Sequence, residues 1–182
     1  MSRTVRVWDP LVRICHWSLA LAFFANYFVN EEGEAWHRWL GYYAVVWLVV
    51  RFGWGFVARG AAAWSDFLPT PARLRAHVSA LLRGADIHRL GHSPLGALVM
   101  ILMMSAMLAL GITGFMMEEI DYFWGEEWLE NLHALIANGL AGLVALHLLA
   151  ALVESLRLRE NLPLSMIDGR RRPQSRGAGE GR

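Results

Sequence analysis

Long apolar stretches alternate with short polar connections along this 182-residue chain. A helix needs about 20 apolar residues to cross the hydrocarbon core of a bilayer, because each residue adds about 1.5 Å. Four stretches reach roughly that length, at about 11–29, 36–57, 94–117 and 132–154. A soluble domain does not need apolar runs this long. The pattern therefore predicts an all-α integral membrane protein, a four-helix bundle formed by one domain over residues 1–160.

The longest polar connection, residues 58–93, contains a short amphipathic segment. Thr70 can cap a helix, Pro71 suits its first position, and Gly84 suits the position after its end. Apolar side chains share one face of this segment and arginines lie on the other, so we expect a helix over about 71–83. Two placements stay open: a helix on the membrane surface with its arginines toward anionic headgroups, or a soluble cap over the bundle.

The charge distribution predicts how the spans are oriented. All seventeen basic residues are arginine, and all except Arg38 lie in the N-terminal flank, the 58–93 connection, the adjoining ends of spans, or the tail. The two short connections after the first and third spans hold nine acidic residues. Arginine beside short loops marks the cytoplasmic side, so both termini are expected in the cytoplasm and the acidic connections outside. Residues 161–182 would form a cytoplasmic tail whose polar end is disordered.

The N-terminal segment holds the one cysteine of the chain, Cys15. A single cysteine excludes an internal disulfide and a C-x-x-C-H haem attachment site, so we interpret Cys15 as a small packing residue. Arg3 and Arg6 before an apolar run also fit a signal peptide. However, no small-residue cleavage pattern follows, and Arg13 and His16 interrupt the start of the run. We therefore expect a retained first helix.

Four of the seven histidines fall within predicted spans, where an imidazole is costly unless its nitrogens are bound. His16 and His147 lie at a similar depth near the cytoplasmic side, and His37 and His133 lie near the outer side. His133 and His147 are fourteen positions apart, so they share one helix face at a separation of about 21 Å along the axis. The spacing predicts two sites stacked in the bundle, one near each membrane surface.

Paired imidazoles without further ligands favour haem over zinc. Zinc normally takes additional Cys, Asp or Glu ligands, and none lies at these depths. Haem iron with two axial histidines needs no other side-chain ligand. The residues one turn after the four histidines are all small and would leave room for a porphyrin: Ala20, Gly41, Ala137 and Ala151. Small residues also mediate ordinary helix packing, and each histidine could instead be a hydrogen-bonded polar group at a helix interface.

Several segments resemble the prokaryotic cytochrome b561 family, which includes the b-type cytochrome subunits of nickel–iron hydrogenases. They are VRVWDPLVRICHWSLALAFF, WHRWLGYYAVVWLVVRFGWGF, LGHSPLGALVMI and LHALIANGLAGLVALHLLAALVESLRLRENLPLSMIDGRR. The resemblance extends from about residue 5 to 172. It implies a four-helix protein of the bacterial inner membrane that carries two non-covalent b haems. Such proteins exchange electrons with quinones and periplasmic redox partners.

The family's ligands can be carried over by position. Its first-span histidine falls on His16, its H-x-x-x-G motif falls on His37 and Gly41, and its fourth-span pair falls on His133 and His147. The haem ligand pairs that the resemblance implies agree with the pairs reached from depth.

Two further side chains are candidates for cofactor binding. His92, within GHSPLG, matches a segment of the family and could line a quinone pocket, hold a haem propionate or cap a helix. Arg51 lies near the depth of the inner haem, where its paired donors suit a propionate, although it could also extend to the inner surface. His77 and His88 lie in the polar connection and are expected to be solvated.

These features predict a dihaem b-type cytochrome that carries electrons across the inner membrane between the quinone pool and a periplasmic redox partner. The haem iron, and no catalytic side chain, would perform the electron chemistry. Acidic outer connections would attract a basic c-type cytochrome or an iron–sulfur subunit such as that of a hydrogenase. One alternative is a haem-containing anchor and relay subunit of a larger oxidoreductase without its own quinone site. Another is a haem-free helical packing module.

Overall fold

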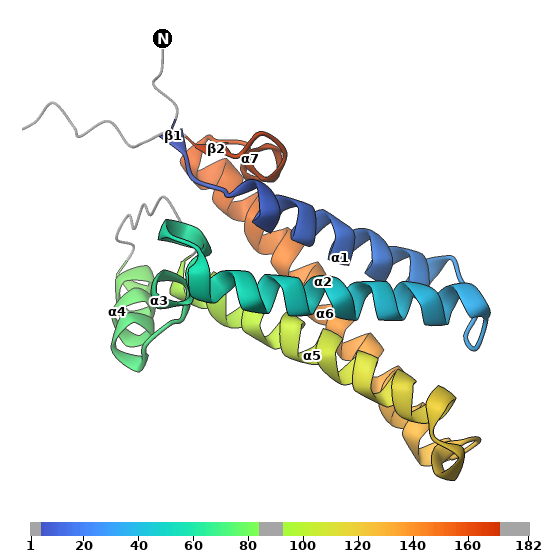
Figure 1. Ribbon diagram of the computed structural model, residues 1–182. Coiled ribbons are helices and arrows are strands. Elements are labelled where there is room, and N and C mark those ends of the chain that lie inside the picture. The colour runs from blue at the N-terminus through green and yellow to red at the C-terminus, as the bar shows by residue number, and fades with distance from the viewer. Residues whose placement is uncertain (1–4, 84–92, 172–182) are drawn as a thin grey trace, which may run out of the picture.

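The computed structural model describes residues 5–83 and 93–171, and long helices dominate it (Figure 1). Four helices in these two ranges are long and apolar enough to cross a membrane: α1 (Pro10–Phe28), α2 (Ala35–Val57), α5 (Pro94–Glu119) and α6 (Glu127–Leu158). The first three lie within two residues of the predicted spans, whereas α6 extends about a turn beyond 132–154 at each end. The chain is a multi-pass helical membrane protein.

The remaining elements are short and lie near the ends of the long helices. They are β1 (Val5–Arg6), η1 (Gly60–Ala62), α3 (Trp64–Phe67), α4 (Pro71–Leu82), η2 (Asp121–Phe123), α7 (Leu162–Asp168) and β2 (Arg170–Arg171). The strands pair antiparallel, with Val5 opposite Arg171. Only η2 lies in the connection between α5 and α6, whereas the others gather at the opposite end of the bundle (Figure 1).

Several helices begin with a side-chain cap and have proline in their first turn. The caps of α1, α5 and α7 are Asp9, Ser93 and Asn161, whose side-chain oxygens accept backbone N–H groups at 2.8, 3.1 and 2.9 Å. Proline in the first turn has the φ of a helix and lacks an N–H that would need a partner there. Thr70 accepts the Arg73 N–H at 3.2 Å, as predicted for the start of α4.

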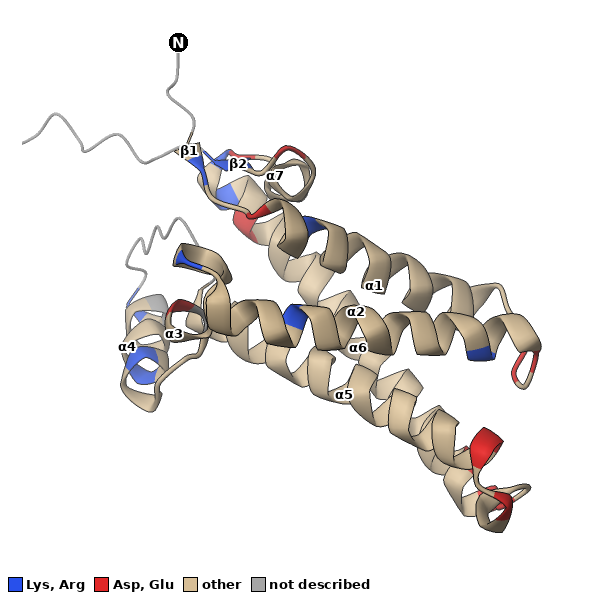
Figure 2. Cartoon of the chain, viewed as in Figure 1, with Lys and Arg blue, Asp and Glu red and all other residues tan. Residues whose placement is uncertain are grey.

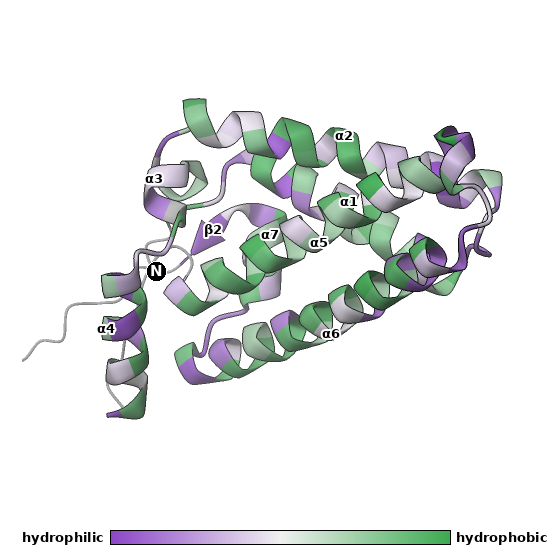
Figure 3. Ribbon diagram, turned by 90° about the horizontal axis from the view of Figure 1, so that it is seen from below, coloured by the Kyte–Doolittle hydropathy of each residue, from purple (hydrophilic) through white to green (hydrophobic). Residues whose placement is uncertain are grey.

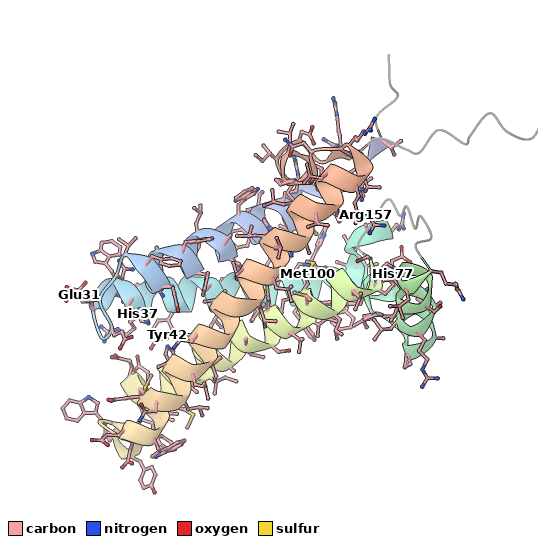
Figure 4. The ribbon with its side chains drawn as sticks, turned by 180° about the vertical axis from the view of Figure 1, so that it is seen from behind. Glu31, His37, Tyr42, His77, Met100 and Arg157 are labelled. Carbon is pink, nitrogen blue, oxygen red and sulfur yellow. The ribbon has the colours of Figure 1, made fainter. Side chains whose placement is uncertain are left out.

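The bundle is formed by three closely packed helix pairs, α1 with α2, α2 with α5, and α5 with α6. Helix α6 crosses α1 and α2 obliquely and meets them mainly through side chains (Figures 1 and 4). Only 6% of the most apolar window of α5 or α6 is buried within the chain. Hydrophobic residues predominate along the long helices (Figure 3), and many of their large apolar side chains are exposed. Lipid therefore covers much of this apolar surface.

Apart from Arg51 within α2, most charged residues lie toward the two ends of the bundle (Figure 2). We call the end that holds the α1–α2 and α5–α6 connections the acidic end; its carboxylates are Glu31, Glu32, Glu34, Glu118, Glu119, Asp121, Glu126, Glu127 and Glu130. The opposite end, with β1, α4 and α7, is the arginine-rich end. Arg38 pairs with Glu118 at 2.7 Å, and the Tyr42 hydroxyl donates to Glu119 at 2.7 Å. These contacts join α2 to α5 at the acidic end.

The segment after α6 packs against the start of α1. The indole N–H of Trp8 donates to the Ser165 hydroxyl at 3.1 Å, and that of Trp17 donates to the Met166 carbonyl at 3.1 Å. Both Trp8 and Ser165 are buried. Together with the β1–β2 pair, these contacts join residues 161–171 to the bundle. Residues 161–171 therefore pack against the bundle, and the end of the predicted tail lies outside the described residues.

Helix α4 runs across the arginine-rich end and packs against α5 (Figure 1). The prediction that His77 is solvated is wrong, because this side chain is 9% exposed and lies between α4 and the start of α5 (Figure 4). Arg73 and Arg75 on the same helix are exposed. His88 lies outside the described residues.

Candidate functional site

His16 on α1 and His147 on α6 face each other near the arginine-rich end of the bundle. Their ring centroids lie 6.5 Å apart, and the ring planes are inclined by 54°. Trp17 packs its ring edge-on to His16 with centroids 5.2 Å apart. The structure thus brings together two histidines from the first and last spans.

His37 on α2 and His133 on α6 form a second pair near the acidic end. Their ring centroids lie 6.2 Å apart, with planes inclined by 57°. The Asn26 side-chain amide donates to the His37 carbonyl at 2.9 Å and so fixes the first turn of α2 against α1. The Thr113 hydroxyl lies 2.7 Å from Nδ1 of His133. Helix α6 therefore contributes one ring to each pair.

The ring separations test whether one iron fits between the paired histidines. An imidazole nitrogen binds a metal at about 2 Å and lies about 1.1 Å from its ring centre, so two rings on opposite sides of one iron have centres about 6.2 Å apart. The measured separations are 6.5 and 6.2 Å. Two rings hydrogen-bonded to each other would have centres only about 5 Å apart. The four imidazoles thus fit axial ligation of two haems.

The donor set also suits haem. Among the described residues, no group of three or more His, Cys, Asp or Glu side chains could hold a metal ion. A porphyrin brings four equatorial nitrogens of its own, so a pair of axial imidazoles is sufficient. The Nδ1 atoms of His16 and His37 are buried and have no hydrogen-bond partner among the described residues.

Small residues leave open space beside the second pair. A Cβ placed on Gly41, one turn after His37, would meet no atom within 4 Å. A Cβ on Gly114 would come to 3.6 Å from Cε1 of His133. A flat ring can therefore approach the helix backbones at these positions.

Arg51 is a buried cation near the first pair. It is 6% exposed and lies near Cys15, the neighbour of His16. Its guanidinium lies 4.8 Å from the ring centre of Trp64, which donates its indole N–H to the Phe52 carbonyl at 2.9 Å. The side chain therefore points into the bundle and does not extend to the surface.

Sequence reasoning did not identify Thr113 or Trp64 as part of this region. A threonine within an otherwise apolar span is a usable signal for Thr113, since its hydroxyl needs a partner in hydrocarbon. Cys15 is 1% exposed and packs as predicted. His92 lies outside the described residues, so its predicted role stays a prediction.

A four-span helical bundle whose half-buried histidines pair across helices defines a membrane protein with the side chains to hold haem between its spans. The family model described as prokaryotic cytochrome b561 matches residues 7–169, and the chain belongs to that family. No curated protein and no solved structure matches the chain. The protein is therefore a membrane b-type cytochrome, which binds haem and transfers electrons.

Proposed function

We propose that this cytochrome carries two b haems, one held by His16 and His147 and the other by His37 and His133. The observation that supports the proposal is the separation of the paired ring centres, 6.5 and 6.2 Å. Both distances agree with two imidazoles sharing one iron and exceed the distance for two hydrogen-bonded rings.

The two pairs lie at different depths, which favours electron transfer across the membrane. His133 and His147 lie on one face of α6, about 21 Å apart along its axis. Arginine beside short loops marks the cytoplasmic side, so the arginine-rich end and both termini would lie in the cytoplasm of a bacterium and the acidic end in the periplasm. The stacked haems would then carry electrons across the inner membrane.

Quinone would react near the arginine-rich end. A groove of about 750 Å³ between α1, α2 and α7 is lined largely by apolar side chains and includes Arg13, Trp17 and Tyr43. This volume lies within the range of small-molecule sites. Trp17 also packs against His16, so a quinone in this groove would lie one side chain away from the inner haem. His92 is a further candidate at this end.

Arg51 and Gly41 would hold the haems from α2. The guanidinium of Arg51 offers paired donors to a propionate of the inner haem, and its stacking on Trp64 fixes its direction. Gly41 would let the outer porphyrin lie close to the backbone of α2.

The acidic end would receive the redox partner. Its nine carboxylates present negative charge to a basic surface, such as that of a c-type cytochrome, and would speed the encounter at low salt. Large aromatic side chains also stand out there, with Tyr122 80% and Trp124 84% exposed. Exposed aromatics favour a second candidate function, in which this end permanently docks an iron–sulfur or hydrogenase subunit and the haems act as relays without a quinone site.

Spectroscopy of the purified full chain tests these proposals. The dithionite-reduced protein should show the α-band of b haem at two haems per polypeptide, and a haem-free preparation would contradict the proposal. Adding a quinol analogue to the oxidised protein separates the two candidate functions. Reduction by quinol supports exchange with the quinone pool, whereas reduction by dithionite alone supports the relay subunit.

A further inference from the structure

Thr113 on α5 contacts the ring of His133 directly. Its hydroxyl oxygen lies 2.7 Å from Nδ1, and the residue is 6% exposed. In the described part of the chain, His133 is the one paired histidine whose ring has a side-chain hydrogen bond. The two ligand pairs are therefore not equivalent.

Counting protons shows which way this hydrogen bond runs. The Thr113 hydroxyl lies 2.9 Å from the Ala109 carbonyl oxygen and 3.2 Å from that of Leu110. Carbonyls only accept, so the single hydroxyl proton points to them. If it pointed to His133, the hydroxyl oxygen would face two carbonyl oxygens with no proton between. The Thr113 oxygen therefore accepts from Nδ1–H of His133, and Nε2 of that ring carries the lone pair.

We propose that Thr113 is a positioning residue that fixes the tautomer and orientation of His133 and tunes the outer haem. This inference rests on the proposed role of His133 as an axial ligand. An Nδ1–H that donates to a fixed acceptor makes the ligating nitrogen more basic. A more basic ligand stabilises ferric iron more than ferrous iron, so Thr113 lowers the potential of the outer haem.

The neighbouring backbone supports this role. Gly114 follows Thr113, and a Cβ there would come to 3.6 Å from Cε1 of His133, so α5 lies directly against this ring. The Thr113 hydroxyl is also bonded to its own helix, which leaves it little freedom to turn away. His37, across the pair, has a buried Nδ1 without such a partner among the described residues. Within this pair, Thr113 and α5 therefore hold the ring of His133, whereas no equivalent contact to Nδ1 holds the ring of His37 among the described residues.

The test is a redox titration of the purified haem-loaded protein, followed at the α-band. Thr113→Val keeps the shape and removes the hydroxyl, Thr113→Ser keeps the hydroxyl, and Ser105→Ala removes an exposed hydroxyl on the same helix. Thr113→Val should move one of two components to a higher potential. At a fixed ambient potential its oxidised-to-reduced ratio should fall by roughly tenfold, equivalent to about 59 mV. Thr113→Ser and Ser105→Ala should leave both components in place.

Unchanged potentials in a folded Thr113→Val protein that retains both haems would overturn the inference. Thr113→Ala provides the same measurement if the valine variant does not fold, and loss of the outer haem alone supports the inference, because outer-shell partners contribute about 10- to 100-fold to metal affinity. His133→Ala separates this inference from the proposal beneath it. If that variant keeps both haems, the ligand assignment fails. If it loses one haem while Thr113→Val is silent, only the role of Thr113 fails.

Discussion

His37 on α2 and His133 on α6 hold their imidazole centres 6.2 Å apart, although their helices do not pack closely along their lengths. The contact exists because α6 crosses the bundle and presents one histidine near each end. Helix α6 is thus common to both pairs, whereas α1 and α2 each serve one. Local changes in α1 or α2 should therefore affect one haem and spare the other.

Gly41 offers such a local change. We predict that Gly41→Leu abolishes binding of the outer haem and leaves the inner haem in place, because the new side chain would occupy the space beside His37. The chain itself has no atom within 4 Å of a Cβ at this position, so the fold should tolerate the substitution. The haem-to-protein ratio of the purified variant, from the absorbance of the reduced protein, should be half that of the wild type.

Gly53→Leu on the same helix is the matched control. Gly53 is also open to a Cβ within 4 Å but is exposed and lies far from His37 along α2. This variant should retain the full haem content. Equal haem content in the two leucine variants would show that Gly41 does not face the porphyrin.

Gly53 also serves as a control for Gly55, two residues further along α2. A Cβ on Gly55 would clash with the indole ring of Trp64, whereas a Cβ on Gly53 meets no atom within 4 Å. Gly55→Ala must displace the Trp64 ring, with its hydrogen bond to Phe52 and its stack with Arg51, and should destabilise the protein by roughly 1–3 kcal/mol. Gly53→Ala should stabilise the helix by about 0.5–1 kcal/mol. Unfolding in detergent measures both, and equal stabilities would refute the close packing at Gly55.

The contact between Trp8 and Ser165 predicts how the C-terminal segment is held. Trp8→Ala removes a buried indole and its hydrogen bond, at a cost of about 3–5 kcal/mol, so α7 should detach more often. We expect trypsin cleavage after the exposed Arg159 to accelerate at least about tenfold. Trp8→Phe keeps most of the packing and should change cleavage only a few-fold. Trp124→Ala, at a position 84% exposed, is the control and should cleave at the wild-type rate.

Much of this architecture was predictable, because a membrane limits what a long apolar stretch can become. Backbone groups in hydrocarbon must be paired within the segment, so each stretch of about 20 apolar residues forms a helix. Depth along these helices then brought His16 level with His147 and His37 level with His133, and in the structure the rings of each pair face each other with centres 6.5 and 6.2 Å apart. Among the four spans, only α6 differed from its predicted bounds by about a turn at each end, because its first and last turns carry charged residues and lower the hydropathy there.

Contacts that depend on how each helix is rotated about its axis, or on how the connecting segments pack, were not predictable. A threonine in a span can bond to its own helix or to a neighbouring one, and only the crossing of α5 and α6 shows that Thr113 meets His133. The burial of His77 depends on how α4 folds back onto α5, which no periodicity encodes. The packing of residues 161–171 on α1 depends on a few specific hydrogen bonds and a two-residue strand pair.

The most direct test measures which haem each histidine holds. The four single alanine variants of His16, His147, His37 and His133 are purified with haem, and their reduced spectra and midpoint potentials are compared with those of the wild type. His16→Ala and His147→Ala should lose the same spectral component, and His37→Ala and His133→Ala should both lose the other. Full haem content in all four variants, or a shared loss between His37→Ala and His147→Ala, would contradict the account.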